Sequence, residues 1–219
     1  MFTGIVQARC KVASMTRNSF GARLRIDTSN WSPAGGYVPG HGDSICVSGV
    51  CLTVAELSSG GLVFDVIAET LSKSTLGSLK VGSEVNIEPA VLPTQPLGGH
   101  FMQGHVDAVA EVVAVKDSPQ EWRTTIKPPV ELLATIIPKG SIAIDGVSLT
   151  IASVAEDRFD VALIPTTLKL TTLADRKPGD KVNIEADILA KTLVNYLEKF
   201  TAAGGSSALT MQKLRDAGI

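Results

Sequence analysis

Short runs of valine, isoleucine and leucine, separated by glycine, proline and serine, form the dominant pattern along the chain. Their length and β-branched content are typical of strands. We predict strands at residues 44–47, 51–57, 61–67 and 84–88, and again at 141–144, 149–154, 158–164 and 181–185. Turn signals lie between them, and Asp145-Gly146 is a strong hairpin signal. Short strands at this density, with few helical patterns, predict a sandwich or a barrel in each half.

Two gaps, 31–40 and 127–138, are too long for tight hairpins, and each is expected to carry a helical turn that plugs a barrel end. After Asp187 the apolar spacing changes to that of a helix, which predicts an amphipathic helix of about three turns. Its apolar positions are Ile188, Leu189, Leu193, Val194, Tyr196, Leu197 and Phe200. This stripe would either pack on its own barrel or mediate self-association, and the pattern leaves both open.

The chain also repeats itself. Residues 42–54 align with 139–151 and residues 70–88 with 167–185, both at an offset of 97, and nine of the 19 positions in the second pair are identical. Residues 2–7 align with 102–107 at an offset of 100. A repeat of this length indicates two similar domains rather than a solenoid. We expect domains at 1–95 and 97–187, joined by the proline-containing linker 90–96, then a helix at 188–202 and a tail at 203–219.

Composition narrows the class of protein. The 219 residues fit two domains, and 44% apolar with 19% charged residues is ordinary for a globular chain. The net charge of −2, without a basic stripe, makes nucleic acid an unexpected partner. Three cysteines argue against a disulfide framework and for a reducing compartment, so we expect a cytoplasmic protein. We find no signal peptide and no run of 18 apolar residues that would span a membrane.

General catalytic motifs are missing from the sequence. His100 and His105 lie five residues apart with no third metal ligand nearby, and no glycine-rich phosphate loop or nucleophile elbow occurs. We therefore expect no metal site, and general motifs do not indicate the chemistry. What remains is polar residues at matching places in the two repeats, namely Ser44, Cys51, Thr53, Glu69 and Thr70, and then Ser141, Ser148, Thr150, Thr166 and Thr167.

These matched hydroxyls lie in or beside apolar strands, where each needs a hydrogen-bond partner. Any one of them alone could simply satisfy neighbouring backbone. Their repetition favours two equivalent sites for a polyhydroxylated, heteroaromatic small molecule.

The repeats differ at three positions, where a catalytic difference between like sites would lie. Cys51 stands opposite Ser148, and it is either a small buried residue or a thiol near a ligand. His105 stands where the first repeat has Ile5, and it is either a satisfied core histidine or a proton carrier. Asp187 stands opposite Ala90 and suits both an N-cap of the final helix and a site carboxylate.

The segments 1–6, 48–54, 98–106, 145–150 and 182–185 together resemble riboflavin synthase of the alpha-chain type, over roughly residues 1–200. This resemblance implies two six-stranded antiparallel Greek-key β-barrels in tandem, and a trimer of chains that associate through the C-terminal helix. Each barrel would bind one 6,7-dimethyl-8-ribityllumazine, with the active site between the N-terminal barrel of one chain and the C-terminal barrel of the next. One lumazine would donate a four-carbon unit to the other, giving riboflavin and 5-amino-6-(D-ribitylamino)uracil without a cofactor.

The resemblance also assigns residues to the two sites. The N-barrel site is expected to comprise Phe2, Gly4, Ile5, Val6, Ser44, Cys51, Leu52, Thr53, Asp65, Val66, Ile67, Ala68, Glu69 and Thr70. The C-barrel site is expected to comprise Gly104, His105, Val106, Lys139, Ser148, Leu149, Thr150, Leu163, Ile164, Pro165, Thr166, Thr167 and Leu168.

Roles follow from the same resemblance. His105 would move a proton at the reacting methyl group, whose protons are unusually acidic in such a lumazine. Ser148 and Thr150 would hold the ring edge, and Ser44, Cys51 and Asp187 would stabilise or hydrate the partner ring, with Phe2 shaping the site. Thr166 departs from members that carry glutamate there, which leaves the ribityl contacts of the C barrel less defined.

Three alternatives stay open. A non-catalytic lumazine- or flavin-binding protein on this scaffold would have lost the polar set of one barrel, and both sets are present. A flavin-dependent reductase would need a nicotinamide-binding domain, for which two barrels leave no room. A structural trimer module would not need matched hydroxyls. The sequence also leaves open an association with lumazine synthase.

Overall fold

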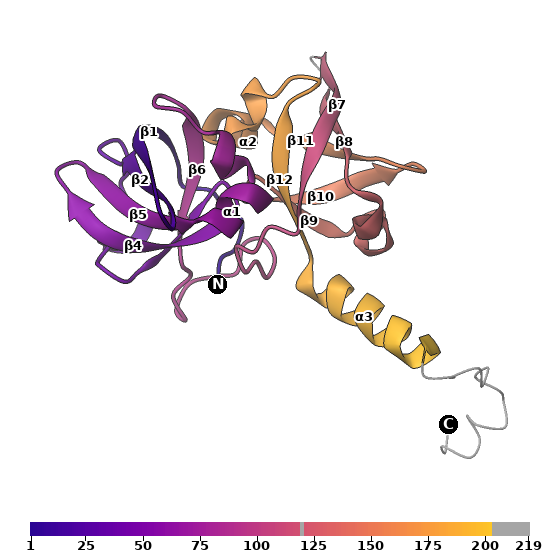
Figure 1. The fold of residues 1–219 in the computed structure, drawn as a ribbon. Helices are drawn as coiled ribbons and strands as arrows, with labels where there is room; N and C mark the ends of the chain where they lie inside the picture. Colours follow the sequence, from indigo (N-terminus) through magenta and orange to yellow (C-terminus); the bar gives the residue numbers. More distant parts are fainter. Residues whose placement is uncertain (119–120, 203–219) are drawn as a thin grey trace, which may run out of the picture.

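Two β-barrels and a projecting helix make up the computed structural model, which describes residues 1–118 and 121–202 (Figure 1). The first barrel contains β1 (Ala8–Asn18), β2 (Gly21–Asp27), β3 (Ser44–Val47), β4 (Val50–Ser58), β5 (Gly61–Ile67) and β6 (Glu84–Pro89). The second contains β7 (Ala108–Ser118), β8 (Glu121–Lys127), β9 (Ser141–Ile144), β10 (Val147–Val154), β11 (Phe159–Leu163) and β12 (Lys181–Ala186). Short helices lie between strands: η1 (Ala34–Gly36), α1 (Ala68–Lys73), η2 (Thr75–Ser78), η3 (Val130–Thr135), α2 (Pro165–Leu170) and η4 (Thr172–Asp175).

Both barrels close with the same Greek-key strand order, β1-β2-β5-β4-β3-β6 in the first and the equivalent order in the second. All strand pairs are antiparallel, so the prediction of two six-stranded antiparallel barrels is confirmed. The two long gaps each contain a 3-10 helix, η1 and η3, as predicted.

Equivalent two-residue turns close the β3–β4 and β9–β10 hairpins. Ser48 and Gly49 have φ angles of 45° and 88°, and Asp145 and Gly146 have φ angles of 46° and 78°. Positive φ at both central residues is the geometry of a type I′ turn, whose twist matches that of the flanking strands. The hairpin predicted at Asp145-Gly146 is therefore confirmed.

Each barrel encloses its own apolar core. Leu24, Ile26 and Phe64 are fully buried in the first barrel, and Ile126 and Phe159 are fully buried in the second. Burying each such side chain contributes about 1.5–3 kcal/mol. Each core can therefore stabilise its own barrel, which leaves polar side chains at the barrel mouths.

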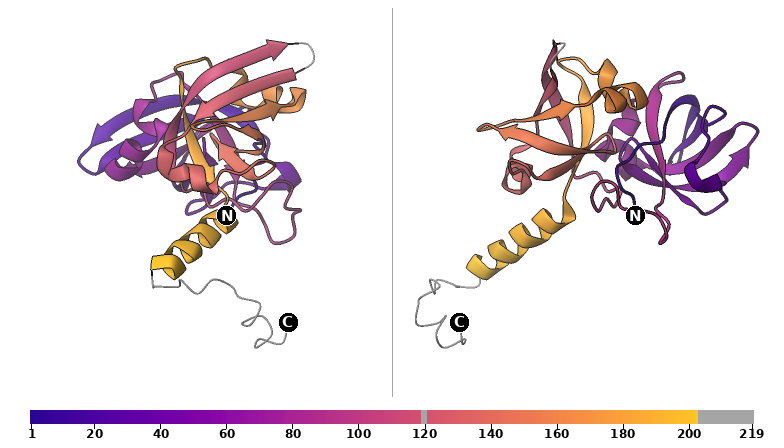
Figure 2. Two further views of the ribbon diagram at one scale, coloured as in Figure 1. Left: turned by 90° about the vertical axis from the view of Figure 1, so that its right-hand side faces the viewer. Right: turned by 180° about the vertical axis from the view of Figure 1, so that it is seen from behind.

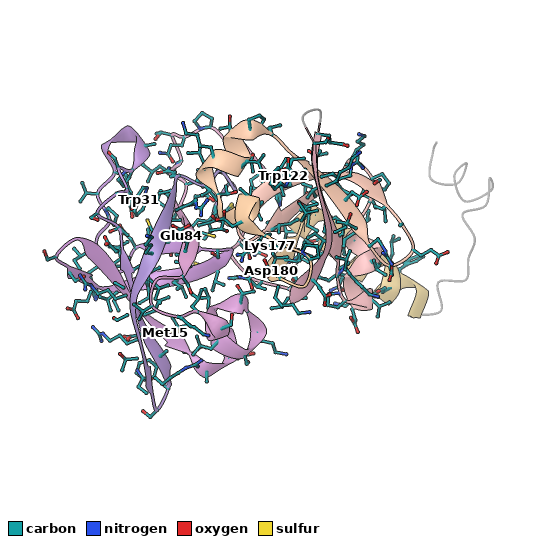
Figure 3. All side chains as sticks on the ribbon, turned by 90° about the horizontal axis from the view of Figure 1, so that it is seen from above. Met15, Trp31, Glu84, Trp122, Lys177 and Asp180 are labelled. Atoms are coloured by element: carbon teal, nitrogen blue, oxygen red, sulfur yellow. The ribbon has the colours of Figure 1, made fainter. Side chains whose placement is uncertain are left out.

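A smaller apolar cluster of Phe2, Cys46, Met102 and Ala143 joins the two barrels. The side-chain amides of Asn86 and Asn183 reach from each barrel into the other, where they donate to the Asp145 and Ser48 oxygens. Arg9 adds ion pairs to Glu84 and to Asp175 at the rim of the junction. Figure 3 shows the molecule from above, with Glu84 labelled on the first barrel and Lys177 and Asp180 labelled on the second.

Helix α3 (Ile188–Ala202) leaves β12 and projects away from both barrels in all three views (Figures 1 and 2). Asp187 caps it, because its Oδ1 accepts a hydrogen bond of 2.9 Å from the Leu189 N–H, which confirms the predicted N-cap. Leu189, Leu193 and Tyr196 are each at least 60% exposed. The alternative that this stripe packs on its own barrel is therefore wrong, because the helix extends past the barrel surface. The predicted tail at 203–219 lies outside the described residues.

Candidate functional site

The segments that precede each barrel, residues 1–7 and 101–107, are called here the lead-in segments. They pair antiparallel at Phe2 and Met102, with the Phe2 N–H 2.8 Å from the Met102 oxygen and the Met102 N–H 3.1 Å from the Phe2 oxygen. Each then runs over the opposite barrel before returning to its own. Val6 accordingly packs in the core of the second barrel, and Val106 packs against that of the first.

This crossing reverses part of the sequence assignment. The Gly104 oxygen accepts a 2.7 Å hydrogen bond from the Cys51 N–H, and the Gly4 oxygen accepts a 2.9 Å bond from the Ser148 N–H. The assignment of Gly4, Ile5 and Val6 to the N-barrel mouth, and of Gly104, His105 and Val106 to the C-barrel mouth, is therefore wrong. The repeat placed each segment beside the barrel that follows it in sequence, whereas pairing of the two segments directs each to the other barrel.

The two glycines at these crossings have no room for a side chain. A Cβ at Gly4 would lie 2.5 Å from the Ser148 Cβ, and one at Gly104 would lie 2.7 Å from the Cys51 Cβ. Both glycines also have positive φ angles, of 78° and 76°. Backbone is therefore pressed directly against the two strand residues that the repeat matched, Cys51 and Ser148.

Two buried glutamates, Glu88 and Glu185, hold the lead-in segments in place. The Glu88 carboxylate accepts from the Thr3 N–H at 2.7 Å and the Gly4 N–H at 3.0 Å. The Glu185 carboxylate accepts from the Gln103 N–H at 2.7 Å and the Gly104 N–H at 3.0 Å. Burial raises the pKa of both carboxyls, and these hydrogen bonds oppose the rise.

A cavity of about 260 Å³ opens at the mouth of the first barrel. The structure brings together there seven residues predicted for a site, Cys51, Ile67, Glu69, Thr70, Gly104, His105 and Val106, joined by Val50, Lys73 and Ser74. The alternative of a core histidine is wrong for His105, since its side chain is exposed at this cavity. Cys51 is half-buried and lines the same cavity, so its thiol has access to whatever enters.

At the second barrel the corresponding residue, Ser148, pairs with a histidine that the sequence analysis did not select. The His100 Nδ1 lies 2.7 Å from the Ser148 Oγ, and the His100 side chain is 7% exposed. Burial lowers the pKa of His100 below its usual value, while the negative charge of Asp187 opposes the shift. His100 was considered only as a metal ligand, although its place in the segment 98–106 could have marked it.

The His100 Nε2 is buried and has no hydrogen-bond partner among the residues that the structure describes. An unpaired polar atom at a barrel mouth suits a ligand or a bound water. His100, Ser148 and Asp187 thus gather at the C-barrel mouth, where Gly99 lies so close that a Cβ would meet the Ser148 Oγ at 3.0 Å.

We expect the stability of the protein to fall as the pH decreases from about 6.5 through the lowered pKa of His100. The unfolded chain binds a proton at higher pH than the folded chain, so protonation favours unfolding in this window. Denaturant midpoints measured between pH 5 and 8 should show a smaller decline for His100→Gln than for the wild type. A variant with the full decline would show that another group dominates.

The remaining predicted residues are more scattered. Four predicted residues belong to the barrel cores, namely Leu52, Val66, Leu149 and Leu163, and Phe2 is fully buried between the barrels. The side chains of these five residues can shape a barrel mouth only indirectly, by positioning the backbone. Ser44 faces Thr53 and Ser141 faces Thr150 across equivalent strand pairs. Exposed positions are Ile5, Asp65, Ala68, Lys139, Ile164, Pro165 and Thr166, with Thr167 and Leu168 half-buried.

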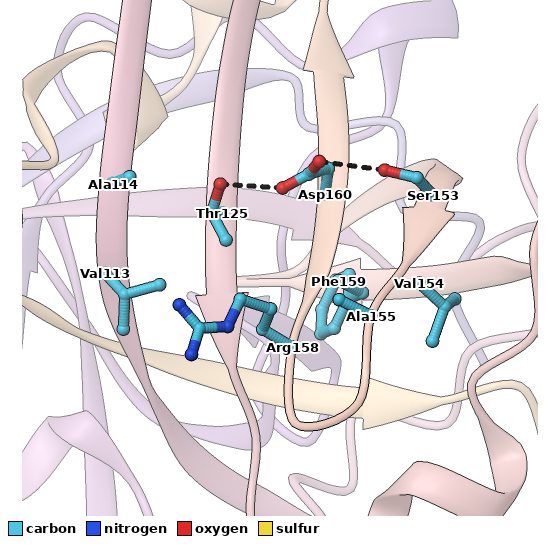
Figure 4. A pocket seen from close by; sticks show the side chains of 9 residues that line it. All are labelled: Val113, Ala114, Thr125, Ser153, Val154, Ala155, Arg158, Phe159 and Asp160. Carbon is cyan, nitrogen blue, oxygen red and sulfur yellow. Dashed lines mark hydrogen bonds between the residues drawn. The ribbon is translucent and has the colours of Figure 1, made fainter.

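A larger hollow of about 520 Å³ lies on the second barrel between β7, β8, β10 and β11 (Figure 4). Asp160 occupies its polar side and is saturated by Thr125 Oγ1 at 2.6 Å and Ser153 Oγ at 2.8 Å. Arg158 at its edge pairs with Asp157 at 2.7 Å. Since Asp160 and Arg158 already have polar partners, this hollow presents fewer unpaired polar groups to a ligand than the barrel mouths do.

Within residues 1–118 and 121–202, no cluster of three histidine, cysteine or acidic side chains could hold a metal ion. None of the helices in the described part of the chain combines the length and apolar character that crossing a bilayer needs. The fold and its two polar mouths define the class of protein. It is a tandem β-barrel protein in which an architecture suited to binding a small molecule occurs twice.

Comparison with known proteins agrees with this class. The sequence model of the lumazine binding domain matches residues 3–90 and 103–187. The chain is 45% identical over 210 residues to riboflavin synthase of Mycobacterium tuberculosis, covering 94% of this chain and 100% of that protein. It is 35% identical over 220 residues to riboflavin synthase of Bacillus subtilis, covering 100% of both. The chain therefore belongs to the riboflavin synthase family, built from two lumazine binding domains.

Among solved structures, LumP complexed with riboflavin has a TM-score of 0.74 and 27% identity, covering 85% of this chain and 99% of LumP. LumP complexed with 6,7-dimethyl-8-(1'-D-ribityl) lumazine has a TM-score of 0.73 and 25% identity, with the same coverage. The tandem-barrel architecture is thus shared with proteins that bind flavin and lumazine.

Proposed function

We propose that the protein catalyses the dismutation of two molecules of 6,7-dimethyl-8-ribityllumazine. One molecule transfers a four-carbon unit to the other, giving riboflavin and 5-amino-6-(D-ribitylamino)uracil, which makes the protein a transferase of riboflavin biosynthesis. The observation that carries this proposal is the duplicated mouth, with Cys51 under Gly104 in one barrel and Ser148 under Gly4 in the other. Two like substrates need two like sites, and the full-length similarity to riboflavin synthases supports the same conclusion.

Each site is proposed to take its residues from one barrel and the opposite lead-in segment. In the N-barrel site these are Ser44, Cys51, Leu52, Thr53, the stretch 65–70, Gly104, His105 and Val106. In the C-barrel site these are Gly4, Ile5, Val6, Lys139, Ser148, Leu149, Thr150, the stretch 163–168, His100 and Asp187.

The reaction mainly requires that the two substrates be correctly oriented. Holding two ring systems in reacting geometry could supply about 7–11 kcal/mol of the barrier. His105, exposed at the N-barrel cavity, is placed to move a proton on or off a methyl carbon of the ring. Ser148, hydrogen-bonded to a histidine that is neutral at physiological pH, can donate to or accept from the edge of the other ring.

The test is to incubate the purified protein with 6,7-dimethyl-8-ribityllumazine, without metal or cofactor, and to follow riboflavin by absorbance. We expect one riboflavin for every two lumazines consumed. His105→Ala should lower turnover by about a hundredfold, at the lower end of general acid–base effects. Cys51→Ala, assayed alongside, ranks the thiol against the imidazole, and His41→Ala removes an exposed histidine as a control.

A non-catalytic lumazine-binding protein is the second candidate, favoured by the similarity to LumP structures. Retention of polar residues at both mouths argues against it. Tight binding of lumazine with no riboflavin formed would establish this alternative instead.

The chain is further proposed to act as a homotrimer in the cytoplasm, joined through α3, with each reacting pair held between barrels of neighbouring chains. Support comes from the exposed apolar side chains of α3, from the family and from the sparse free cysteines. Light scattering should give a mass of about three times 22.9 kDa. A monomer that turns over lumazine would contradict the shared site. Association with lumazine synthase remains an open prediction.

A further inference from the structure

Two of the cysteines face each other across the β3–β4 hairpin. Cys46 and Cys51 are directly opposed partners in the strand register, one pair beyond the closing pair Val47 and Val50. The two-residue turn at Ser48 and Gly49 fixes this register. Both thiols are free, and opposed residues of an antiparallel pair carry their side chains on the same face.

The hydrogen bonds of these strands show that Cys46 and Cys51 form a non-hydrogen-bonded pair. The Cys51 N–H donates outward to the Gly104 oxygen at 2.7 Å. Two hydrogen bonds to β6 lie on either side of Cys46. The Ser48 N–H donates to the Asn86 oxygen at 2.8 Å, and the Ala90 N–H donates to the Ser44 oxygen at 3.1 Å. The amide of Cys46 therefore faces β6. Such pairs bring the Cα atoms to about 4.5 Å, inside the range that a disulfide spans.

The two thiols differ in their access to solvent. Cys46 is 2% exposed and packs with Phe2 and Met102, while Cys51 packs against the same cluster and also lines the 260 Å³ cavity. Burial raises the pKa of the Cys46 thiol well above its usual value, so Cys46 reacts poorly by itself. Cys10 is buried in the core of the first barrel beside Asn30 and has no part in this pair.

We propose that Cys46 and Cys51 form a reversible disulfide that inactivates the N-barrel site under oxidising conditions, by withdrawing the Cys51 thiol from its mouth. Hydrogen peroxide oxidises the Cys51 thiol to a sulfenic acid and releases one water. The Cys46 sulfur then attacks the Cys51 sulfur, forming the S–S bond and releasing a second water. A dithiol reverses the reaction by exchange. The new bond draws the Cys51 sulfur from the cavity toward the buried cluster.

The bond itself can be tested by mass, independently of activity. Both cysteines lie on one tryptic peptide, 26–73, because no lysine or arginine separates them, and Cys10 lies outside it. After treatment with hydrogen peroxide and alkylation without reductant, this peptide should be about 2 Da lighter than the reduced, unalkylated peptide. Dithiothreitol should restore two alkylatable thiols. A peptide that only gains oxygen, or whose two cysteines both remain alkylatable, would overturn the proposal.

The inactivation of the site rests on the proposed function and is measured separately, by lumazine binding and by riboflavin formation. Oxidised wild type should lose about tenfold or more in turnover and recover with dithiothreitol, while Cys10→Ala should behave as wild type. Cys46→Ala should keep its reduced activity and show no lighter peptide, with oxygen accumulating on Cys51 instead. A lighter wild-type peptide with unchanged binding and turnover would leave the disulfide standing and refute the inactivation of the site. If wild type has no turnover at all, the proposed function fails while binding and mass still decide this proposal.

Discussion

Replacing Asn86 and Asn183 together by alanine is expected to lower the free energy of unfolding by about 4 kcal/mol, at roughly 1 kcal/mol for each buried backbone group left unpaired. The Asn86 side chain donates to the Asp145 oxygen at 2.8 Å and accepts from the Thr172 N–H at 2.8 Å. Asn183 repeats this in the opposite direction, donating to the Ser48 oxygen at 2.7 Å and accepting from the Thr75 N–H at 2.7 Å.

These four bonds join the two barrels, and both asparagines are 1% exposed. Three of the bonds are buried, and the bond from the Thr75 N–H is partly buried. Neither barrel loses core contacts in the variant, because alanine removes only the bridging amide. We therefore expect the barrels to lose their coupling before they lose their folds, and the single unfolding transition to separate into two.

Urea unfolding followed by tryptophan fluorescence can resolve the two transitions, because Trp31 lies in the first barrel and Trp122 in the second (Figure 3). Asn195→Ala, on the exposed surface of α3, is the matched control and should change stability by less than about 0.5 kcal/mol. A double variant within 1 kcal/mol of wild type would show that the junction does not depend on these four hydrogen bonds.

Glu185→Gln is expected to abolish lumazine binding at the N-barrel site and to lower turnover by about a hundredfold or more. The reason is that each lost charge-assisted hydrogen bond costs on the order of 1.5–3 kcal/mol. Glutamine keeps one acceptor oxygen but turns an NH₂ group toward one of the two N–H donors of Gln103 and Gly104. The segment that carries Gly104 and His105 then loses its anchor, although Glu185 belongs to the other barrel.

Glu88→Gln is the mirror experiment. It releases Thr3 and Gly4, and because the Gly4 oxygen accepts a hydrogen bond from the Ser148 N–H, it should disturb the C-barrel site instead. Titration calorimetry with lumazine should give two bound molecules per wild-type chain and one for each variant. Alkylation of Cys51 should be faster in Glu185→Gln only, because Gly104 covers this residue.

Glu111→Gln serves as the control, because Glu111 makes only an exposed ion pair with Lys181 on the same barrel. It should bind two lumazines and turn over as wild type does. Accelerated alkylation of Cys51 in Glu88→Gln, with none in Glu185→Gln, would refute the crossed anchoring.

The sequence by itself determined the duplication and most of the strands. The β3–β4 and β9–β10 hairpins followed from local chemistry, since only glycine-containing turns with two positive φ angles close them. The first hairpin of each barrel was not recognised from pattern. Bulges between Val12 and Ser14, and between Val112 and Ala114, shift the alternation of inward and outward residues in the middle of β1 and β7.

The amphipathic helix was predictable because its stripe is periodic, and so was its cap, because Asp187 immediately precedes the helix. The projection of this helix from the barrels was not predictable, since an apolar stripe has the same spacing whether it packs against its own chain or against another. The sequence also named Cys51, Ser148 and His105, because the repeat exposes matched positions and the differences between them.

Only the tertiary structure decided which barrel each lead-in segment serves and which residues meet there. Crossing of the segments depends on backbone pairing at Phe2 and Met102, and on buried carboxylates more than 80 residues away from Thr3 and Gln103. Only the tertiary structure identifies His100 as a site residue, through its contact with Ser148, which lies 48 residues away in the sequence. Local propensity determines turns, strands and caps, whereas a site assembled from distant segments is set by how whole barrels pack.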